Sequence, residues 1–176
     1  MPVATPAESL CREVALGLSH MVSLRRMTVA DLPEVLSLEN DAFQAPWSRR
    51  AFLHEINNNP AALPMVATIE GRTVGYLVAW MVADEAHIAT LAVAAGWRRQ
   101  GIGRILLEHV LQLAQGQRCR AAYLEVRRSN HAAQALYAAL GFQHLGVRPR
   151  YYAPQQEDAL VMVKRIHEGE EEHGLV

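Results

Sequence analysis

The stretch that decides the fold reads GWRRQGIGR and runs from Gly96 to Arg104. It follows the apolar run HIATLAV, residues 87–93, and an amphipathic helical pattern begins at Ile102. Glycines between a strand and a helix let backbone N–H groups approach a ligand closely, and the N-terminus of a helix attracts anions. The stretch therefore predicts a strand, a phosphate-binding loop and a helix, in that order.

Two common phosphate-binding loops fit this stretch poorly. Gly96 and Gly101 have the spacing of a P-loop, but Ile102 and Gly103 stand where that loop needs a lysine and a hydroxyl. The dinucleotide-binding fingerprint would accept Gly101 and Gly103, yet Leu106 replaces its third glycine. A pyrophosphate cradle that uses no metal fits better, and a tight turn without any ligand remains the simpler alternative.

The patterns on both sides of the loop predict a mixed sheet. Alternating residues predict an antiparallel meander over 65–69, 73–82 and 86–93, and further strands over 121–126, 142–147 and 159–164. Helical patterns cover 28–43, 46–56, 102–114 and 129–141. A strand, helix and strand in succession after residue 86 favour a right-handed crossover and one parallel pair. We therefore expect an α/β fold with helices on both faces of the sheet.

Composition limits the possible functions. The chain has 176 residues, a net charge of −1 and two cysteines, Cys11 and Cys119. A nearly neutral chain without interleaved aromatic and basic residues gives no sign of nucleic-acid binding, and no apolar run approaches the ~20 residues of a membrane span. Two distant cysteines indicate neither a disulfide framework nor a zinc site, so we expect no metal and a reducing cytoplasm.

The chain divides into three parts by pattern. Residues 1–22 are predicted to be a loosely held N-terminal extension, in which 7–19 could form a helix. Residues 23–166 form one domain, and the acidic stretch 167–176, HEGEEEHGLV, is expected to be a solvated tail.

Over residues 23–165 the sequence resembles the GNAT acetyltransferases. The loop matches their coenzyme A loop at Arg98, Gly101 and Gly103. The other matching pieces are PWS at 46–48, LEVRRSN at 124–130, ALYAALGF at 135–142, RYY at 150–152 and EDALVM at 157–162. The resemblance is greatest to the branch that acetylates the N-terminal alanine of a small-subunit ribosomal protein. It implies a central, mostly antiparallel sheet of about seven strands with one splayed parallel pair.

The resemblance also implies a site for acetyl-CoA, the expected co-substrate. The loop would bind its pyrophosphate, and the strand before the loop would bind its acyl arm in the gap of the splayed pair. Asn130 matches a coenzyme A contact, although it could simply cap its helix. The implied binding residues are Leu91, Ala92, Val93, Arg98, Arg99, Gln100, Gly101, Ile102, Gly103, Arg104 and Asn130.

Glu125 is the predicted general base. In AAYLEV, period-2 alternation puts Ala122, Leu124 and Val126 on one face of the strand and Glu125 on the other. A carboxylate inside an apolar strand is costly unless it has a task or a partner. The resemblance implies that it deprotonates the acceptor amine. A structural ion pair with an arginine such as Arg127 is the alternative.

Tyr137 is the predicted general acid. Its position on the inward stripe of the helix over 129–141 would by itself favour core packing. The resemblance implies instead that its phenol, protonated at neutral pH, gives a proton to the leaving thiolate.

The acceptor side is inferred from the resemblance as well. The walls of a peptide groove are expected at Phe43, Pro46, Trp47, Tyr151 and Tyr152, with acidic side chains such as Glu39, Asp41 or Asp84 at the entrance. The expected partner is a protein N-terminus, with no nucleic acid or membrane and with the oligomeric state left open. A small-molecule amine as acceptor, or a non-catalytic acyl-CoA-binding module, are the alternatives.

Overall fold

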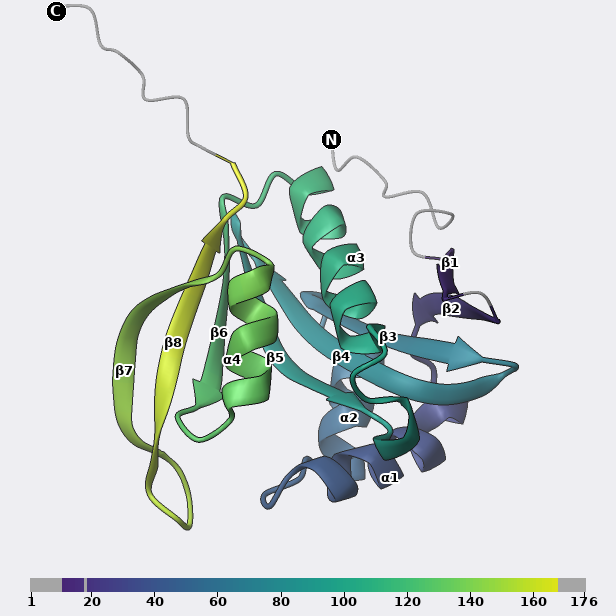
Figure 1. Cartoon of the computed structure of the whole chain (residues 1–176), viewed down its shortest axis with the longest axis horizontal. Coiled ribbons are helices and arrows are strands. Elements are labelled where there is room, and N and C mark those ends of the chain that lie inside the picture. The colour runs from purple at the N-terminus through teal and green to yellow at the C-terminus, as the bar shows by residue number, and fades with distance from the viewer. Residues whose placement is uncertain (1–10, 18, 168–176) are drawn as a thin grey trace, which may run out of the picture.

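The computed structural model describes residues 11–17 and 19–167. The sheet in this part of the chain has eight strands in the order β1-β2-β3-β4-β5-β6-β8-β7 (Figure 1). The strands are β1 (Arg12–Leu16), β2 (His20–Arg26), β3 (Ala62–Ile69), β4 (Arg72–Val82), β5 (Glu85–Val93), β6 (Ala121–Arg127), β7 (Gln143–Tyr152) and β8 (Glu157–Arg165). The helices are α1 (Leu32–Ala42), α2 (Arg49–Asn57), α3 (Ile102–Gly116) and α4 (His131–Ala139).

The sheet is antiparallel except at one place. β5 and β6 are parallel, and α3 forms the crossover between them. The predicted mixed sheet with a parallel pair is confirmed, with one strand more than the seven expected. This pair matters for function because parallel strands are joined by a crossover, which places the loop and the start of α3 at the C-terminal end of β5.

Helices cover both faces of the sheet, as predicted. α3 and α4 pack on one face, where Leu106 and Tyr137 join a large core with side chains of the strands. α1 and α2 pack on the other face, where Val35 and Phe52 join a second core with Tyr76 and Ala92. The chain thus has two apolar layers with the sheet between them, and Figure 1 shows α3 and α4 in front of it.

The N-terminal segment differs from its prediction. Residues 12–16 are neither a helix nor a loosely held arm, because they form β1 and pair antiparallel with β2, Val14 opposite Val22. The boundary expected after residue 22 falls inside β2. Pairing with a neighbouring strand overrides the weak local preference of a short segment. Residues 1–10 and all but the first residue of the predicted acidic tail lie outside the described residues.

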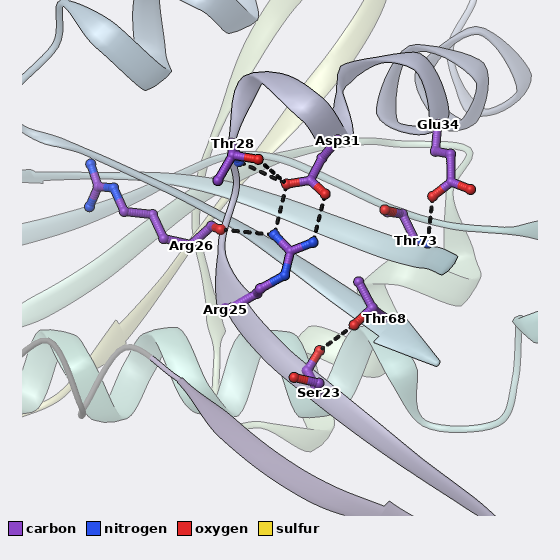
Figure 2. A network of polar contacts seen from close by, with 8 residues as sticks. All are labelled: Ser23, Arg25, Arg26, Thr28, Asp31, Glu34, Thr68 and Thr73. Carbon is purple, nitrogen blue, oxygen red and sulfur yellow. Dashed lines mark hydrogen bonds and ion pairs between the residues drawn. The ribbon is translucent and has the colours of Figure 1, made fainter. Parts of the chain in front are cut away.

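A buried ion pair joins β2 to the start of α1 (Figure 2). Both guanidinium NH₂ groups of Arg25 donate to Asp31, at 2.8 and 2.7 Å, and the backbone N–H of Thr28 donates to the same carboxylate at 2.8 Å. Burial raises the pKa of Asp31, but the bonds from Arg25 and Thr28 outweigh it and hold the pKa below its usual value. The junction therefore fixes where α1 begins.

Candidate active site

A gap opens between β5 and β6 beyond their paired part. The two strands pair only from Glu85 opposite Ala121 to Ile88 opposite Leu124. Figure 1 shows them side by side at the upper end and diverging below, with α4 in front of the widening gap. The splayed pair implied by the resemblance is therefore present, and its open part is flanked by the C-terminal halves of both strands.

The three residues predicted for the acyl arm lie on the β5 side of this gap. Leu91, Ala92 and Val93 pair with β4 on one side, and within the described chain no strand pairs with them on the other. The carbonyl of Val93 accepts a bond from Nε of Arg98 at 3.0 Å. Leu91 and Ala92 therefore offer the backbone that an acyl arm would need.

The loop presents backbone donors as predicted. Gly101 has φ +96°, a left-handed conformation that favours glycine, and precedes the first residue of α3. Among the described residues, no backbone N–H group from 99 to 104 donates to a backbone or side-chain acceptor outside the helix at hydrogen-bond distance. Donors at the positive end of a 15-residue helix suit a pyrophosphate. Together with its glycines, the loop fits coenzyme A.

The polar side chains of this loop already have partners nearby. Arg98 contacts Val93, Gln100 donates to the carbonyl of Gly96 at 3.0 Å, and Arg104 pairs with Glu108 at 2.8 Å. Arg99 is exposed and has φ +62°. Ile102 is buried in the core instead of facing a ligand, so only its backbone can contribute to binding.

Gly103 brings three parts of the site together. A Cβ built on it would lie 3.5 Å from Leu136 of α4, 3.6 Å from Val93 and 4.0 Å from Leu91. The start of α3, the end of β5 and the middle of α4 are therefore neighbours. Asn130 caps α4 by accepting the N–H of Ala133 at 3.1 Å, which is the simpler role that the sequence allowed.

Glu125 lies on the β6 side of the gap. Leu124 and Val126 point into the core under α3 and α4, so alternation directs Glu125 to the opposite face. Its carboxylate is about a quarter exposed and lies 3.2 Å from a guanidinium nitrogen of Arg148, not of Arg127. Arg127 pairs instead with Glu157 at 3.1 Å. An exposed ion pair of this kind contributes little stability, so it leaves the carboxylate available for chemistry.

Tyr137 belongs to α4, the helix that covers the sheet in front of the gap (Figure 1). It is buried beside Phe142, with ring centroids 6.0 Å apart. Burial, together with the nearby Tyr152, raises the pKa of Tyr137 to about 12. The phenol therefore carries its proton at neutral pH, as a general acid must. The expectation of core packing is also correct, since the ring packs while the hydroxyl is kept protonated.

Tyr152 interacts electrostatically with both predicted catalytic groups. Burial and the charges of Tyr151 and Glu125 raise the pKa of Tyr152 to about 12, and the Arg127 guanidinium lies 4.2 Å from the centre of its ring. Tyr151 meets Tyr152 edge-on at 5.1 Å and is half exposed. Both tyrosines lie at the C-terminal end of β7. This is the end of the sheet toward which the gap widens (Figure 1).

The other predicted wall is the connection between α1 and α2. Phe43 and Trp47 are partly buried against the second core, and Pro46 is exposed. Figure 1 shows this connection and the β7–β8 tip both projecting at the lower side of the molecule. The two predicted walls therefore lie at the same end, below the gap.

Two of the acidic residues expected at the entrance are elsewhere. Glu39 is buried, with 1% of its surface exposed. Asp84 pairs with Arg120 before the start of β5, at the closed end of the parallel pair. Asp41 is exposed on α1. The spacing of Glu39 from Leu32 and Val35 puts it on the apolar stripe of α1, a signal that could have shown its burial.

Sequence reasoning also missed Arg148 and Glu157. Glu157 accepts the N–H of Ser129 at 2.7 Å and so holds the turn before α4. Arg148 belongs to β7, two strands away from Glu125, and only the sheet order reveals that they meet.

Residues 11–17 and 19–167 contain neither a cluster of metal-ligating side chains nor a membrane-spanning helix. No group of three or more His, Cys, Asp or Glu side chains is placed to hold a metal ion there. No helix of that region is long and apolar enough to cross a membrane.

Comparison with known families defines the class of protein. A model of the acetyltransferase (GNAT) family matches residues 32–142, which include the loop, β6 and all of α4 with Tyr137. The chain belongs to the GNAT acetyltransferase family, and its fold and its use of acetyl-CoA follow from that membership. The predicted fold class, enzyme class and co-substrate are confirmed, while the roles of single residues stay predictions.

Individual relatives are similar over nearly their full length. A Bacillus subtilis protein named putative ribosomal protein bS18-alanine N-acetyltransferase is 37% identical over 146 residues, which cover 83% of this chain and 97% of that protein. An Escherichia coli K12 protein named ribosomal protein bS18-alanine N-acetyltransferase is 35% identical over 148 residues. These residues cover 83% of this chain and 99% of that protein. The crystal structure of an Escherichia coli ribosomal-protein-S18-alanine N-acetyltransferase has a TM-score of 0.78 and 33% identity, covering 86% and 98%.

Proposed function

We propose that this protein transfers an acetyl group from acetyl-CoA to the α-amine of a protein N-terminus, and that its acceptor is the N-terminal alanine of ribosomal protein bS18. The names of the relatives similar to this chain support the choice of acceptor. The observation that carries the chemistry is the gap between β5 and β6, with Glu125 and Tyr137 on opposite faces of the sheet beside it. A cytoplasmic location follows from that acceptor.

The reaction needs a neutral amine, a polarised thioester and a proton for the leaving group. The α-ammonium loses a proton to the carboxylate of Glu125, directly or through water, and the amine nitrogen attacks the carbonyl carbon of the thioester. The C–N bond forms as the C–S bond breaks. The amine nitrogen loses its second proton to solvent as the amide forms. The thiolate takes the proton of the Tyr137 hydroxyl, Tyr137 recovers one from solvent, and Glu125 releases to solvent the proton that it took.

The backbone of β5 supplies the electrostatic part of this chemistry. N–H groups in the part of β5 that β6 leaves unpaired polarise the thioester carbonyl, since donors fixed in advance are effective where charge develops. The loop before α3 binds the pyrophosphate through the N–H groups of residues 99–104 and so sets how deep the acyl arm reaches. An α-amine, with a pKa near ~8 against ~10.4 for a lysine, suits a carboxylate base.

The experiment is a mass measurement on candidate acceptors. The enzyme is incubated with acetyl-CoA and either a peptide that begins with the bS18 N-terminus or a panel of polyamines and aminoglycosides. We expect a single acetyl group on the α-amine of the peptide and none on the small amines. Acetylation of a small amine in preference to the peptide would support the alternative acceptor class, and no acetylation at all would favour a binding module.

A further inference from the structure

Glu39, the last buried residue of α1, holds both ends of the loop Phe43–Trp47. Its backbone carbonyl accepts the N–H of Phe43 at 3.0 Å, which ends the helix. Its side-chain Oε1 accepts the N–H of Trp47 at 2.7 Å. One residue therefore fixes the loop that forms the predicted acceptor wall.

The second oxygen of Glu39 connects this loop to the sheet. The hydroxyl of Tyr76 donates to Oε2 of Glu39. Tyr76 is fully buried in β4, opposite Ala92 of β5. Hydrogen bonds thus connect the wall to β4, and the pairing of Tyr76 with Ala92 continues the connection to the strand that would hold the acyl arm.

The arrangement is costly for a purely structural contact. Burial raises the pKa of Glu39 even though the Trp47 N–H and the Tyr76 hydroxyl both lower it. Apolar residues of similar volume often replace buried charged groups without loss of stability. The neighbouring aromatic rings already pack well, since Trp47 stacks on Trp80 at 6.3 Å and lies 5.4 Å from Phe52. A carboxylate is needed here only if the position of the loop matters.

We infer that Glu39 is a positioning residue for the acceptor: it keeps the loop Phe43–Trp47 at a fixed distance from β5 and thereby sets the affinity for the peptide and the choice of its first residue. The inference rests on the proposed function, because it takes that loop as the acceptor wall. Glu39 itself is buried and does not touch the substrate.

The test compares two substitutions at Glu39. Glu39→Leu fills the space but cannot accept either hydrogen bond. We expect it to raise KM for an alanine-initiated peptide about tenfold or more, because small displacements in a site have large effects, and to reduce the preference for Ala over Ser and Met. Glu39→Gln can still accept the Trp47 N–H, and its KM should stay near that of the wild type. Calorimetry should show unchanged binding of acetyl-CoA to both variants.

Asp31 provides the matched control at the other end of α1. It is a buried carboxylate that holds a turn by accepting a backbone N–H, but its turn joins β2 to the start of α1 and carries none of the predicted wall residues (Figure 2). Asp31→Leu should lower Tm and leave the peptide KM and first-residue preference unchanged. If Glu39→Leu does not fold, Tyr76→Phe removes only the connection to β4 and should raise the peptide KM in the same direction.

Each result is decisive. A wild-type peptide KM and preference in Glu39→Leu, or an equal rise of KM in Asp31→Leu, would overturn the inference and leave Glu39 a structural residue. If the wild-type enzyme acetylates no peptide, the proposed function itself is wrong. That case is recognised because neither the wild type nor any variant then has a measurable KM for the peptide.

Discussion

Glu125 and Tyr137 lie on opposite faces of the sheet, beside the gap where β5 and β6 stop pairing. Glu125 points away from the core that α3 and α4 cover, and Tyr137 belongs to that core. A thioester in the gap would have the carboxylate on the side of the incoming amine and the phenol on the side of the departing sulfur. The predicted base and the predicted acid are thus separated by the strands themselves.

The role of Glu125 can be separated from its ion pair. Glu125→Gln removes the base at nearly constant volume, and we expect kcat to fall by ~10²–10⁴, the usual contribution of such a group. Arg148→Gln breaks the same ion pair and should change kcat by less than about threefold, since the pair is exposed. Steady-state kinetics at saturating acetyl-CoA measures both. Equal losses in the two variants would mean that Glu125 serves only to bind Arg148.

Tyr137 should determine the maximum rate in the pH–rate profile but not the pH at which the rate increases. Its pKa of about 12 means that the phenol keeps its proton throughout the working range. The rate should therefore rise as the α-amine loses its proton near pH ~8 and should show no fall from Tyr137 up to about pH 10. Tyr137→Phe should lower kcat by ~10²–10⁴ with the same rising limb.

Tyr123 is the control for this change. It lies on β6 opposite His87, in the closed part of the parallel pair. Tyr123→Phe should keep the full rate. A Tyr137→Phe variant as active as the wild type would make Tyr137 a packing residue only.

The loop should bind acetyl-CoA through its backbone conformation. Gly101→Ala places a side chain at φ +96°, and such a strained residue costs about 1–3 kcal/mol. We expect the variant to bind acetyl-CoA about tenfold or more weakly in calorimetry. Gly96→Ala, where a Cβ meets nothing within 4 Å and φ is not positive, should bind normally.

The same calorimetry tests the prediction that no metal is required. Acetyl-CoA should bind equally well with and without EDTA, and more tightly than ATP or NAD. Weaker binding in EDTA, or tighter binding of ATP, would contradict this account of the loop.

The Arg25–Asp31 pair should make stability sensitive to acid. The pKa of Asp31 is lowered in the folded protein, so its contribution is present above the unfolded pKa of ~3.9 and is lost as pH falls through the lower, folded value. Asp31→Asn should cost about 1–3 kcal/mol at pH 7. The difference from the wild type should shrink as the pH falls below ~3.9. Urea unfolding at several pH values measures it, with the exposed Glu108→Gln as control. A difference that does not vary with pH would contradict the assignment.

Local patterns in the sequence predicted which way Glu125 points and where the loop lies, but not which side chains contact Glu125. The alternation in β6 correctly directs Glu125 away from the core, and the glycines before α3 predict a loop with unpaired donors. Both features depend on residues next to one another in the chain. Arg148 meets Glu125 across β8, and no local pattern can show a contact that depends on strand order.

The N-terminal strand and Glu39 show two further limits. β1 exists because β2 offers it a pairing edge, so its own sequence, which also allows a helix, does not decide its structure. Glu39 was expected at the entrance because an acidic side chain there would suit a basic acceptor peptide. Its place on the apolar stripe of α1 indicates burial instead. The hydrogen bonds that its carboxylate accepts from Trp47 and Tyr76 explain why a charged residue is buried there.

The acceptor is the central claim, and kcat/KM on matched peptides tests it most directly. The set comprises peptides of one sequence that begin with Ala, Ser or Met, together with an N-blocked alanine peptide that contains an internal lysine, each at saturating acetyl-CoA. We predict the highest kcat/KM for the free alanine peptide and no measurable turnover of the blocked one. A preference for the blocked lysine peptide, or for a free polyamine over every peptide, would contradict the account and leave only the acetyltransferase fold.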